Sequence, residues 1–347
     1  MAGWRFWIDR GGTFTDVVAS DPQGTTHVCK LLSEAPDAYD DAAIEGIRRL
    51  LGVGAGPIPA GLITSVIMGT TVATNALLEG HGDPTVLVVT QGFADAMWIG
   101  YQNRPRLFDL AIHRPEPLYR DVVEVDERVA VDGTVLRRPA REPLLSALRA
   151  AHAGGCTSAA VVLLHGYRFT EHEDLVAELA REAGFEQVST SHDCSALIKF
   201  VARGDTAVVD AYLSPILLRY TERVARDLPG VDLRFMQSNG GLAKAAAFRG
   251  KDAILSGPAG GLIGSVRTSR AAGFERVVTF DMGGTSTDVA HFGGELERSL
   301  ESEVAGVRMR APMLDIHTVA AGDGHLLDGV GHVRHGDAAE ALRDGRD

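Results

Sequence analysis

Cysteine, long apolar runs and positive charge are all scarce in this sequence. Its three cysteines, Cys29, Cys156 and Cys194, are odd in number and unevenly spaced, so neither a disulfide framework nor a CxxC metal site is indicated. So few cysteines are typical of a reducing cytoplasm, which is the predicted location. The sequence has no run of about eighteen apolar residues and no basic, apolar leader, so we expect neither a membrane span nor export.

The charge balance is acidic. Lys and Arg number 34 against 46 Asp and Glu, which gives a net charge of −12 and argues against a nucleic-acid or anionic-membrane surface. It does not argue against ATP, because backbone amides and a metal ion bind a nucleotide locally. The chain has 347 residues, of which 45% are hydrophobic and 40 are glycine, as expected for a globular protein with many turns. Its length suits two domains.

One stretch of the chain occurs twice. The octets Asp9 to Asp16, DRGGTFTD, and Asp281 to Asp288, DMGGTSTD, agree at six of eight positions. Each lies between two apolar runs, which predicts a β-hairpin with a glycine-rich turn. Gly-Gly admits an anion to the backbone N–H groups, Thr hydroxyls add donors, and an Asp at the strand end suits Mg²⁺. The repeat therefore predicts two domains that hold one polyphosphate, with two ordinary glycine turns as the alternative.

Between the two octets, strand and helix patterns alternate, which indicates an α/β protein. An amphipathic helix is expected over 38–51, and the continuous apolar run in 158–167 is typical of a central parallel strand. Segment 65–78 reads as a strand, a Gly-Thr-Thr turn and a helix, in which the threonines either help to hold an anion or cap the helix. A domain boundary is expected near 200–205, followed by a long helix over 206–228.

Three further segments suggest ligand contacts. The turn 238–241, SNGG, reads either as a ligand loop or as a hairpin turn. Small residues between 257 and 264 would let the start of a helix approach a nucleotide or act as a hinge. Arg104 and Arg106 lie in the irregular segment 101–108, which reads as a carboxylate-binding loop or a solvated loop.

Together, these motifs resemble the hydantoinase A/oxoprolinase family, and most closely its ATP-hydrolysing 5-oxoprolinases. The resemblance covers residues 4 to about 322, and so many ordered motifs argue against chance. It rests on the segments FWIDRGGTFTDVVA, MGTTVATNALL, IGYQNRPRLFDL, RGDTAVVDAYLSPIL, MQSNGGL, KDAILSGPAGG, FDMGGTSTDVA and VAGVRMRAPMLDIHTVAAG.

The resemblance implies a fold, an activity and partners. The fold would be that of an actin-like ATPase (ribonuclease H-like) with duplicated domains, the second of them incomplete. The N-terminal domain would be 1–200, the start of the second domain 201–325, and an atypical polar tail 326–347. With ATP and Mg²⁺, the lactam oxygen of 5-oxo-L-proline would be phosphorylated and the ring opened by water to L-glutamate. A hydantoinase B/oxoprolinase-type half and an oligomer are the expected partners.

The same resemblance implies roles for individual residues. Asp9 and Asp281 would be the catalytic carboxylates on the Mg²⁺ side. The ATP phosphates would lie against Gly11, Gly12, Thr13 and Thr15 in the first hairpin, and Gly283, Gly284, Thr285 and Thr287 in the second. The helix between the domains would begin with Ser256, Gly257, Gly260 and Gly261, and Arg104 and Arg106 are the candidates for the substrate carboxylate.

The sequence departs from the family near its end. Asp323 and His325 stand where the family has Gly and Ser, and the residues that follow have no similarity we can place. An incomplete second domain would expose apolar surface around 277–280, so poor solubility or dependence on a partner is expected. Two other functions stay open: hydantoin hydrolysis or ATP-dependent ketone carboxylation within the same family, and a truncated, non-catalytic nucleotide-binding module.

Overall fold

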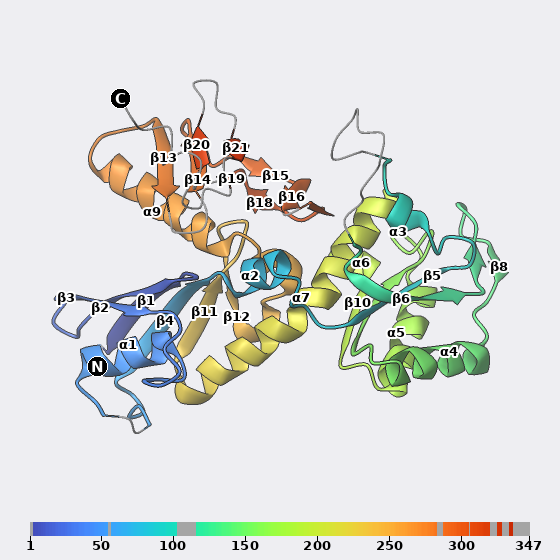
Figure 1. Ribbon diagram of the computed structural model, residues 1–347, viewed down its shortest axis with the longest axis horizontal. Coiled ribbons are helices and arrows are strands. Elements are labelled where there is room, and N and C mark those ends of the chain that lie inside the picture. Colours follow the sequence, from blue (N-terminus) through green and yellow to red (C-terminus); the bar gives the residue numbers. More distant parts are fainter. Residues whose placement is uncertain are drawn as a thin grey trace, which may run out of the picture.

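A computed structural model describes residues 3–54, 57–102, 116–282, 287–304, 306–319, 325–327 and 333–335. Figure 1 shows two lobes, each built on a sheet, and a smaller group of strands above the first lobe. The helices are α1 (Ala42–Leu51), α2 (Val72–Leu78), α3 (Ala96–Ile99), α4 (Arg141–Ala153), α5 (Glu171–Ala183), α6 (Ser191–Cys194), α7 (Phe200–Asp227), α8 (Gly250–Ala253) and α9 (Ser256–Ala271), with a 3₁₀ turn, η1 (Ala245–Ala247).

The first sheet has six strands in the order β12-β11-β4-β1-β2-β3. These strands are β1 (Trp4–Arg10), β2 (Phe14–Ser20), β3 (Thr26–Leu32), β4 (Ile63–Thr70), β11 (Asp232–Met236) and β12 (Leu242–Lys244). Strands β1, β2 and β3 form an antiparallel meander, and β4 lies parallel to both β1 and β11. The first predicted hairpin is confirmed, and the SNGG segment is the turn of the antiparallel β11–β12 hairpin.

Helix α1 covers one face of this sheet. It begins at Ala42, because the carboxylate of Asp41 accepts hydrogen bonds from the N–H groups of Ala43 and Ile44 and so caps it later than the expected residue 38. Its apolar stripe, which includes Ile44 and Ile47, packs on inward-facing strand residues such as Phe6 and Val17. The opposite face of the same strands carries Asp9.

Gly46 in α1 is a packing requirement, and replacing it with Ala should destabilise the protein. An added Cβ would lie 2.6 Å from Cγ2 of Val17 and 2.9 Å from Cδ1 of Leu31, which forces the helix off the sheet. We expect Gly46→Ala to cost about 1–3 kcal/mol in urea unfolding. In α9, Gly264 has nothing within 4 Å of an added Cβ. Gly264→Ala should therefore stabilise by about 0.5–1 kcal/mol, and equal effects of the two changes would contradict this account.

The second sheet is parallel throughout, in the order β10-β9-β5-β6. Its strands are β5 (Thr85–Thr90), β6 (Tyr119–Val125), β9 (Ser158–Val162) and β10 (Gln187–Thr190), and β7 (Arg128–Val129) pairs with β8 (Val135–Arg137) beside it. Helices α4 and α5 cover one face, while α3 and α7 cover the other. The central strand predicted within 158–167 is confirmed, because β9 lies between β10 and β5 and is buried along its whole length.

Helix α7 connects the lobes, and it corrects the expected start of the long helix. It begins at Phe200 rather than at residue 206, so it runs through the segment in which a boundary was expected. Figure 1 shows it running diagonally from the second lobe to the first. Within that segment Arg203 is fully buried and Asp205 is mostly buried, and both are ion-paired. After α7 the chain returns to the first sheet as β11, next to β4.

The third sheet repeats the start of the first. Its strands β13 (Val277–Met282), β14 (Thr287–Phe292) and β19 (His317–Val319) are antiparallel in that order, as β1, β2 and β3 are, although four short strands lie between β14 and β19 in the chain. The strand pairing predicted for the second hairpin is thus confirmed, and α9 packs against β14. Val278, Phe280 and Met282 are 69%, 59% and 68% exposed, so β13 carries the uncovered apolar surface that the sequence predicted.

Short strand pairs complete the C-terminal part. They are β15 (Arg298–Ser299) with β18 (Met313–Leu314), β16 (Ser302–Val304) with β17 (Val307–Met309), and β20 (His325–Leu327) with β21 (Val333–His335). Strand β17 packs on α7, which brings the C-terminal strands to the junction of the lobes.

Candidate functional site

The turn of the first hairpin is held open toward solvent. The N–H of Gly11 donates to the carbonyl of Phe14 at 3.1 Å, and the hydroxyl of Ser33 donates to the carbonyl of Gly11 at 2.7 Å. Gly12 and Thr13 are exposed at the tip. The turn therefore leaves Gly12 and Thr13 accessible from solvent, an arrangement that an anion-binding loop requires.

Thr15 is buried, unlike Gly12 and Thr13, which were predicted to bind phosphate together with it. Its side chain is fully buried, and its hydroxyl is hydrogen-bonded to that of Ser33 at 3.0 Å. Since Ser33 also holds Gly11, Thr15 supports the turn from inside the sheet. The predicted phosphate contact of Thr15 is therefore corrected: its buried hydroxyl supports the turn and does not face a ligand.

Asp9 lies at the end of β1, between two glycines. A Cβ on Gly69 of β4 would be 3.2 Å from Oδ1 of Asp9, and one on Gly257 of α9 would be 3.6 Å from the same oxygen. The hydroxyl of Ser256 donates to the carbonyl of Thr70 at 2.8 Å and so fixes the start of α9 against β4. The positive end of the helix dipole of α9 therefore faces the carboxylate of Asp9.

The other small residues of α9 were predicted as part of this interdomain helix. Gly260 lies against Met236 of β11, with a Cβ 3.8 Å from its side chain, and nothing lies within 4 Å of a Cβ on Gly261. Leu255, which precedes the helix, has a left-handed backbone with φ of 60° and donates its N–H to Oγ1 of Thr74 at 3.1 Å. Such a conformation is costly for leucine and is concentrated at functional sites in proteins.

At the Gly-Thr-Thr turn before α2, Thr70 accepts from a helix N–H, whereas the N-cap residue Thr71 makes no side-chain hydrogen bond to the helix. Oγ1 of Thr70 accepts a hydrogen bond from the N–H of Val72 at 3.2 Å, and Oγ1 of Thr71 donates to the carbonyl of Arg10 at 3.2 Å. Both hydroxyls are thus used inside the protein. The contact of Thr71 with Arg10 joins the start of α2 to the end of β1, beside the first turn.

The second hairpin is described on both sides of its turn. Gly283, Gly284 and Thr285 lie outside the described residues, as do Arg104 and Arg106. Thr287 is buried, and its hydroxyl has no hydrogen-bond partner in the described structure. An unpaired buried hydroxyl is uncommon and marks a place where a ligand could supply the partner.

Both hairpins place two aspartates directly opposite each other. In β1 and β2 the pair is Asp9 and Asp16, and in β13 and β14 it is Asp281 and Asp288. Like charges at such positions destabilise a sheet. Asp16 is paired with Nζ of Lys30 at 2.9 Å, and Asp288 accepts a hydrogen bond from Thr318 at 2.6 Å. A cation bound at either pair would offset this repulsion.

The pKa values agree with this description. Burial raises the pKa of Asp9, and the carboxylates of Asp16 and Asp281 raise it further, while Lys30 lowers it. Burial also raises the pKa of Asp288, to which Asp281 adds, and its bond from Thr318 lowers it. Asp9 and Asp281 thus lie close enough for their charges to interact, although they are 272 residues apart in sequence.

This pair of aspartates fits Mg²⁺ in composition. In the described part of the chain, no three His, Cys, Asp or Glu side chains are grouped as a complete protein metal site. Mg²⁺, however, keeps several waters and binds through one or two carboxylates together with substrate phosphates. Asp9 and Asp281, on the two hairpins, are the residues that would hold it.

A groove of about 410 Å³ lies between α9 and the second hairpin. Gly261 and Ser265 of α9 line one side, and Asp281 and Asp288 line the other. The small side chains of α9 leave this space open, and its volume is within the usual range for ligand pockets. A space of ligand size therefore adjoins the second aspartate pair.

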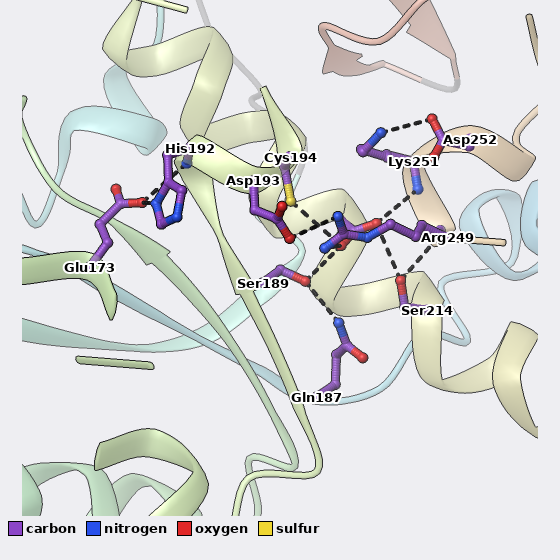
Figure 2. Close-up of polar contacts among 12 residues, drawn as sticks. Glu173, Gln187, Ser189, His192, Asp193, Cys194, Ser214, Arg249, Lys251 and Asp252 are labelled. Atoms are coloured by element: carbon purple, nitrogen blue, oxygen red, sulfur yellow. Dashed lines mark hydrogen bonds and ion pairs between the residues drawn. The ribbon is translucent and has the colours of Figure 1, made fainter. Parts of the chain in front are cut away.

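Sequence reasoning missed a set of buried polar residues along α7. Asp210 is fully buried and accepts hydrogen bonds from Ser189 at 2.8 Å, from Ser214 at 3.2 Å and from the N–H of Lys251 at 3.3 Å. Figure 2 shows Arg249 in the same cluster, 3.5 Å from Asp210, and Glu173 beside His192. These contacts join β10, α7 and α8. Asp210 belongs to the RGDTAVVDAYLSPIL motif, in which a carboxylate among apolar residues is the signal of a buried polar group.

The fold and the site define a class of protein: two-lobed α/β proteins with duplicated glycine-rich hairpins, each carrying two opposed aspartates. Comparison with known families shows which family of this class the chain belongs to. The hydantoinase/oxoprolinase N-terminal region matches residues 5–184, and the hydantoinase/oxoprolinase region matches residues 203–342. The chain belongs to the hydantoinase/oxoprolinase family.

Similar proteins agree with this assignment. The 5-oxoprolinase 1 of Arabidopsis thaliana is 44% identical over 93% of this chain and 28% of its own length. The ATP-dependent caprolactamase of Pseudomonas jessenii, in its crystal structure, has a TM-score of 0.78 and 30% identity over 95% of this chain and 50% of its own. The nucleotide-free structure of acetone carboxylase has a TM-score of 0.79 over 95% of this chain and 50% of its own. Its sequence is 23% identical, so this comparison shows similarity of fold alone. This chain thus spans about a quarter to a half of the length of these relatives.

Among proteins of similar sequence, the caprolactamase subunit alpha of Pseudomonas jessenii is 31% identical over 96% of this chain and 50% of its own length. Among the helices of the described residues, none is both long and apolar enough to cross a membrane.

Proposed function

We propose that this chain is part of an ATP-dependent hydrolase that converts 5-oxo-L-proline to L-glutamate. The observation that carries the proposal is the duplicated Asp-Gly-Gly hairpin: Asp9 of the first copy lies beside two glycines where α9 begins, and its charge interacts with that of Asp281 in the second copy. Such an arrangement suits a metal-bound polyphosphate. The 44% identity to the 5-oxoprolinase of Arabidopsis thaliana supports the substrate.

The proposed chemistry overcomes the low reactivity of an amide. Transfer of the γ-phosphoryl group to the lactam oxygen turns that oxygen into a leaving group. Water then adds to the ring carbon, and the C–N bond opens to leave the former lactam carbonyl as an acyl phosphate. A second water hydrolyses this acyl phosphate to L-glutamate and phosphate, and ADP is the other product. Bound between Asp9 and Asp281, Mg²⁺ would supply charge neutralisation. The protein's own share is positioning: the Gly11 to Thr13 turn orients phosphate oxygens, and the start of α9 holds Asp9.

Several wider expectations belong to the same proposal. The order β3-β2-β1-β4-β11, with a meander followed by parallel strands, supports an actin-like (ribonuclease H-like) fold, and the third sheet supports its duplication. We propose α9, from Ser256 onward, as the helix between the duplicated domains. The relative named subunit alpha supports a hydantoinase B/oxoprolinase-type partner. An oligomer in the cytoplasm remains part of the proposal.

A second candidate is another reaction of the family. The similarity to caprolactamase favours a different cyclic amide, and the likeness of fold to acetone carboxylase keeps ketone carboxylation as a further possibility. The third candidate is a nucleotide-binding module without its own turnover.

ADP formation tests these candidates together. The purified chain with Mg²⁺ and ATP is assayed alone, with 5-oxo-L-proline, with caprolactam, and with acetone plus bicarbonate, each with and without an added B-type half. We expect ADP formation to rise only with 5-oxo-L-proline and to need the added half. A rise only with caprolactam or acetone would replace the proposed substrate. A folded chain that binds ATP and turns over in no sample would favour the non-catalytic module.

A further inference from the structure

An ion pair lies at the junction of the two lobes. Asp205 of α7 and Arg308 of β17 come from segments that are 103 residues apart, and Oδ2 of Asp205 lies 3.2 Å from Nη2 of Arg308. Their side chains are only 14% and 26% exposed. Neither residue belongs to the two hairpins, and the pair is not needed for the phosphate chemistry described above.

Asp205 retains unused capacity as an acceptor. Its Oδ2 is buried and accepts no hydrogen bond within the described structure, because the contact with Arg308 is close in distance but not aligned as a hydrogen bond. Burial raises the pKa of Asp205 to about 7, although Arg308 lowers it. A buried acceptor atom with no donor is uncommon in folded proteins, and a ligand N–H would satisfy it.

The turn after α3 is shaped around the guanidinium of Arg308. Gly100 has φ of 57°, and a Cβ on this residue would clash with Arg308. The ring of Tyr101 lies 5.0 Å from the guanidinium carbon and is 53% exposed, and Ile99 is 39% exposed. Charged groups and apolar side chains open to solvent therefore meet at one place.

Arg308 and the turn after α3 lie at the edge of the second sheet where parallel sheets bind ligands. Helix α3 follows β5, so its turn is at the carboxyl edge of the second sheet. Strand β6, which follows β5 in the chain, lies on one side of β5, and the later strand β9 lies on its other side. Ligands of open α/β sheets bind at the carboxyl ends of strands where the strand order reverses in this way.

We propose that Asp205 and Arg308 recognise the substrate of the proposed hydrolase, a small cyclic amide that carries a carboxylate. This rests on the proposed function. Arg308 binds the carboxylate, the buried Oδ2 of Asp205 accepts the ring N–H, and Tyr101 covers the apolar ring. A guanidinium carries its N–H donors in a planar fork that matches the two oxygens of a carboxylate.

Binding of two ligands that differ only in the carboxylate tests this. The full chain with Mg²⁺ and ATP is titrated with 5-oxo-L-proline and with 2-pyrrolidinone, its ring without the carboxylate, by saturation-transfer NMR. We expect Arg308→Met to weaken 5-oxo-L-proline binding about 10–100-fold and to leave 2-pyrrolidinone unchanged. Asp205→Asn should weaken both ligands about tenfold, because both carry the ring N–H.

Controls keep this test decisive. Arg298→Met removes an exposed arginine of the same C-terminal segment and should change neither affinity. If Arg308→Met does not melt cooperatively, Arg308→Lys, which keeps the charge but loses the planar fork, takes its place and should still weaken 5-oxo-L-proline selectively. Equal binding by the variants and the unchanged chain would overturn the inference and leave the proposed function standing. An unchanged chain that binds ATP but not 5-oxo-L-proline would overturn both.

Discussion

Asp9→Asn should abolish nearly all ATP turnover while making the folded protein more stable. Loss of the carboxylate removes a proposed Mg²⁺ ligand, so substrate-dependent ADP formation should fall about 10²–10³-fold. The same change removes a charge that faces Asp16 across the hairpin and interacts with Asp281. Relief of a like-charge strand pair should raise Tm without Mg²⁺ by about 1–3 °C.

The gain in stability from Asp9→Asn should depend on pH. The folded-state pKa of Asp9 is raised above its unfolded value, so its ionised form opposes folding. This opposition is full at pH values above the raised pKa and fades as the pH falls through that pKa toward the unfolded one. The Tm difference between the variant and the unchanged chain should therefore be largest near neutral pH and shrink in acid.

Asp37→Asn is the matched control for this prediction. Asp37 is an exposed carboxylate in a turn of the first lobe, and its replacement makes the same change in charge. It should alter neither ADP formation nor Tm. If Asp9→Asn kept full turnover, or lowered Tm at neutral pH, the assignment of Asp9 to a cation site would be wrong.

Arg203→Met should destabilise the protein by about 3–5 kcal/mol, because it leaves a buried carboxylate without its cation. Arg203 and Glu173 are both fully buried, and Nη1 of Arg203 lies 3.2 Å from Oε1 of Glu173. Nη2 of Arg203 also donates to the carbonyls of Leu163 and Leu164, at 2.9 and 3.2 Å. The measurement is the free energy of unfolding in urea.

Two comparisons isolate the effect of the buried charge. Arg219→Met removes an arginine of the same helix whose side chain is 56% exposed and paired with Asp83, so it should cost only about 0–1 kcal/mol. Arg203→Met combined with Glu173→Met removes both charges and should cost less than the sum of the two single changes. If Arg203→Met cost no more than Arg219→Met, burial of the pair would not govern its stability.

The two hairpins illustrate how far the sequence leads. The repeated octet, with apolar runs on each side and Gly-Gly at the centre, predicts strand, turn and strand from neighbouring residues alone, and the strand pairing in both hairpins confirms it. Thr15 was beyond that reasoning. It matches Thr287 in the repeat, but its hydroxyl is bonded to Ser33, which the sequence does not place beside it.

By itself, the sequence determined the family, the alternation of strands and helices, and the two aspartate hairpins, because these depend on local pattern and on ordered motifs. Only the tertiary structure decided which distant residues meet. It placed Asp9 between Gly69 and Gly257, and it buried Arg203 and Asp205 in one helix, within the segment 200–205 where the sequence predicts a domain boundary. A polar residue looks the same in sequence whether water or a buried partner satisfies it, since the partner is supplied by packing between segments far apart in the chain.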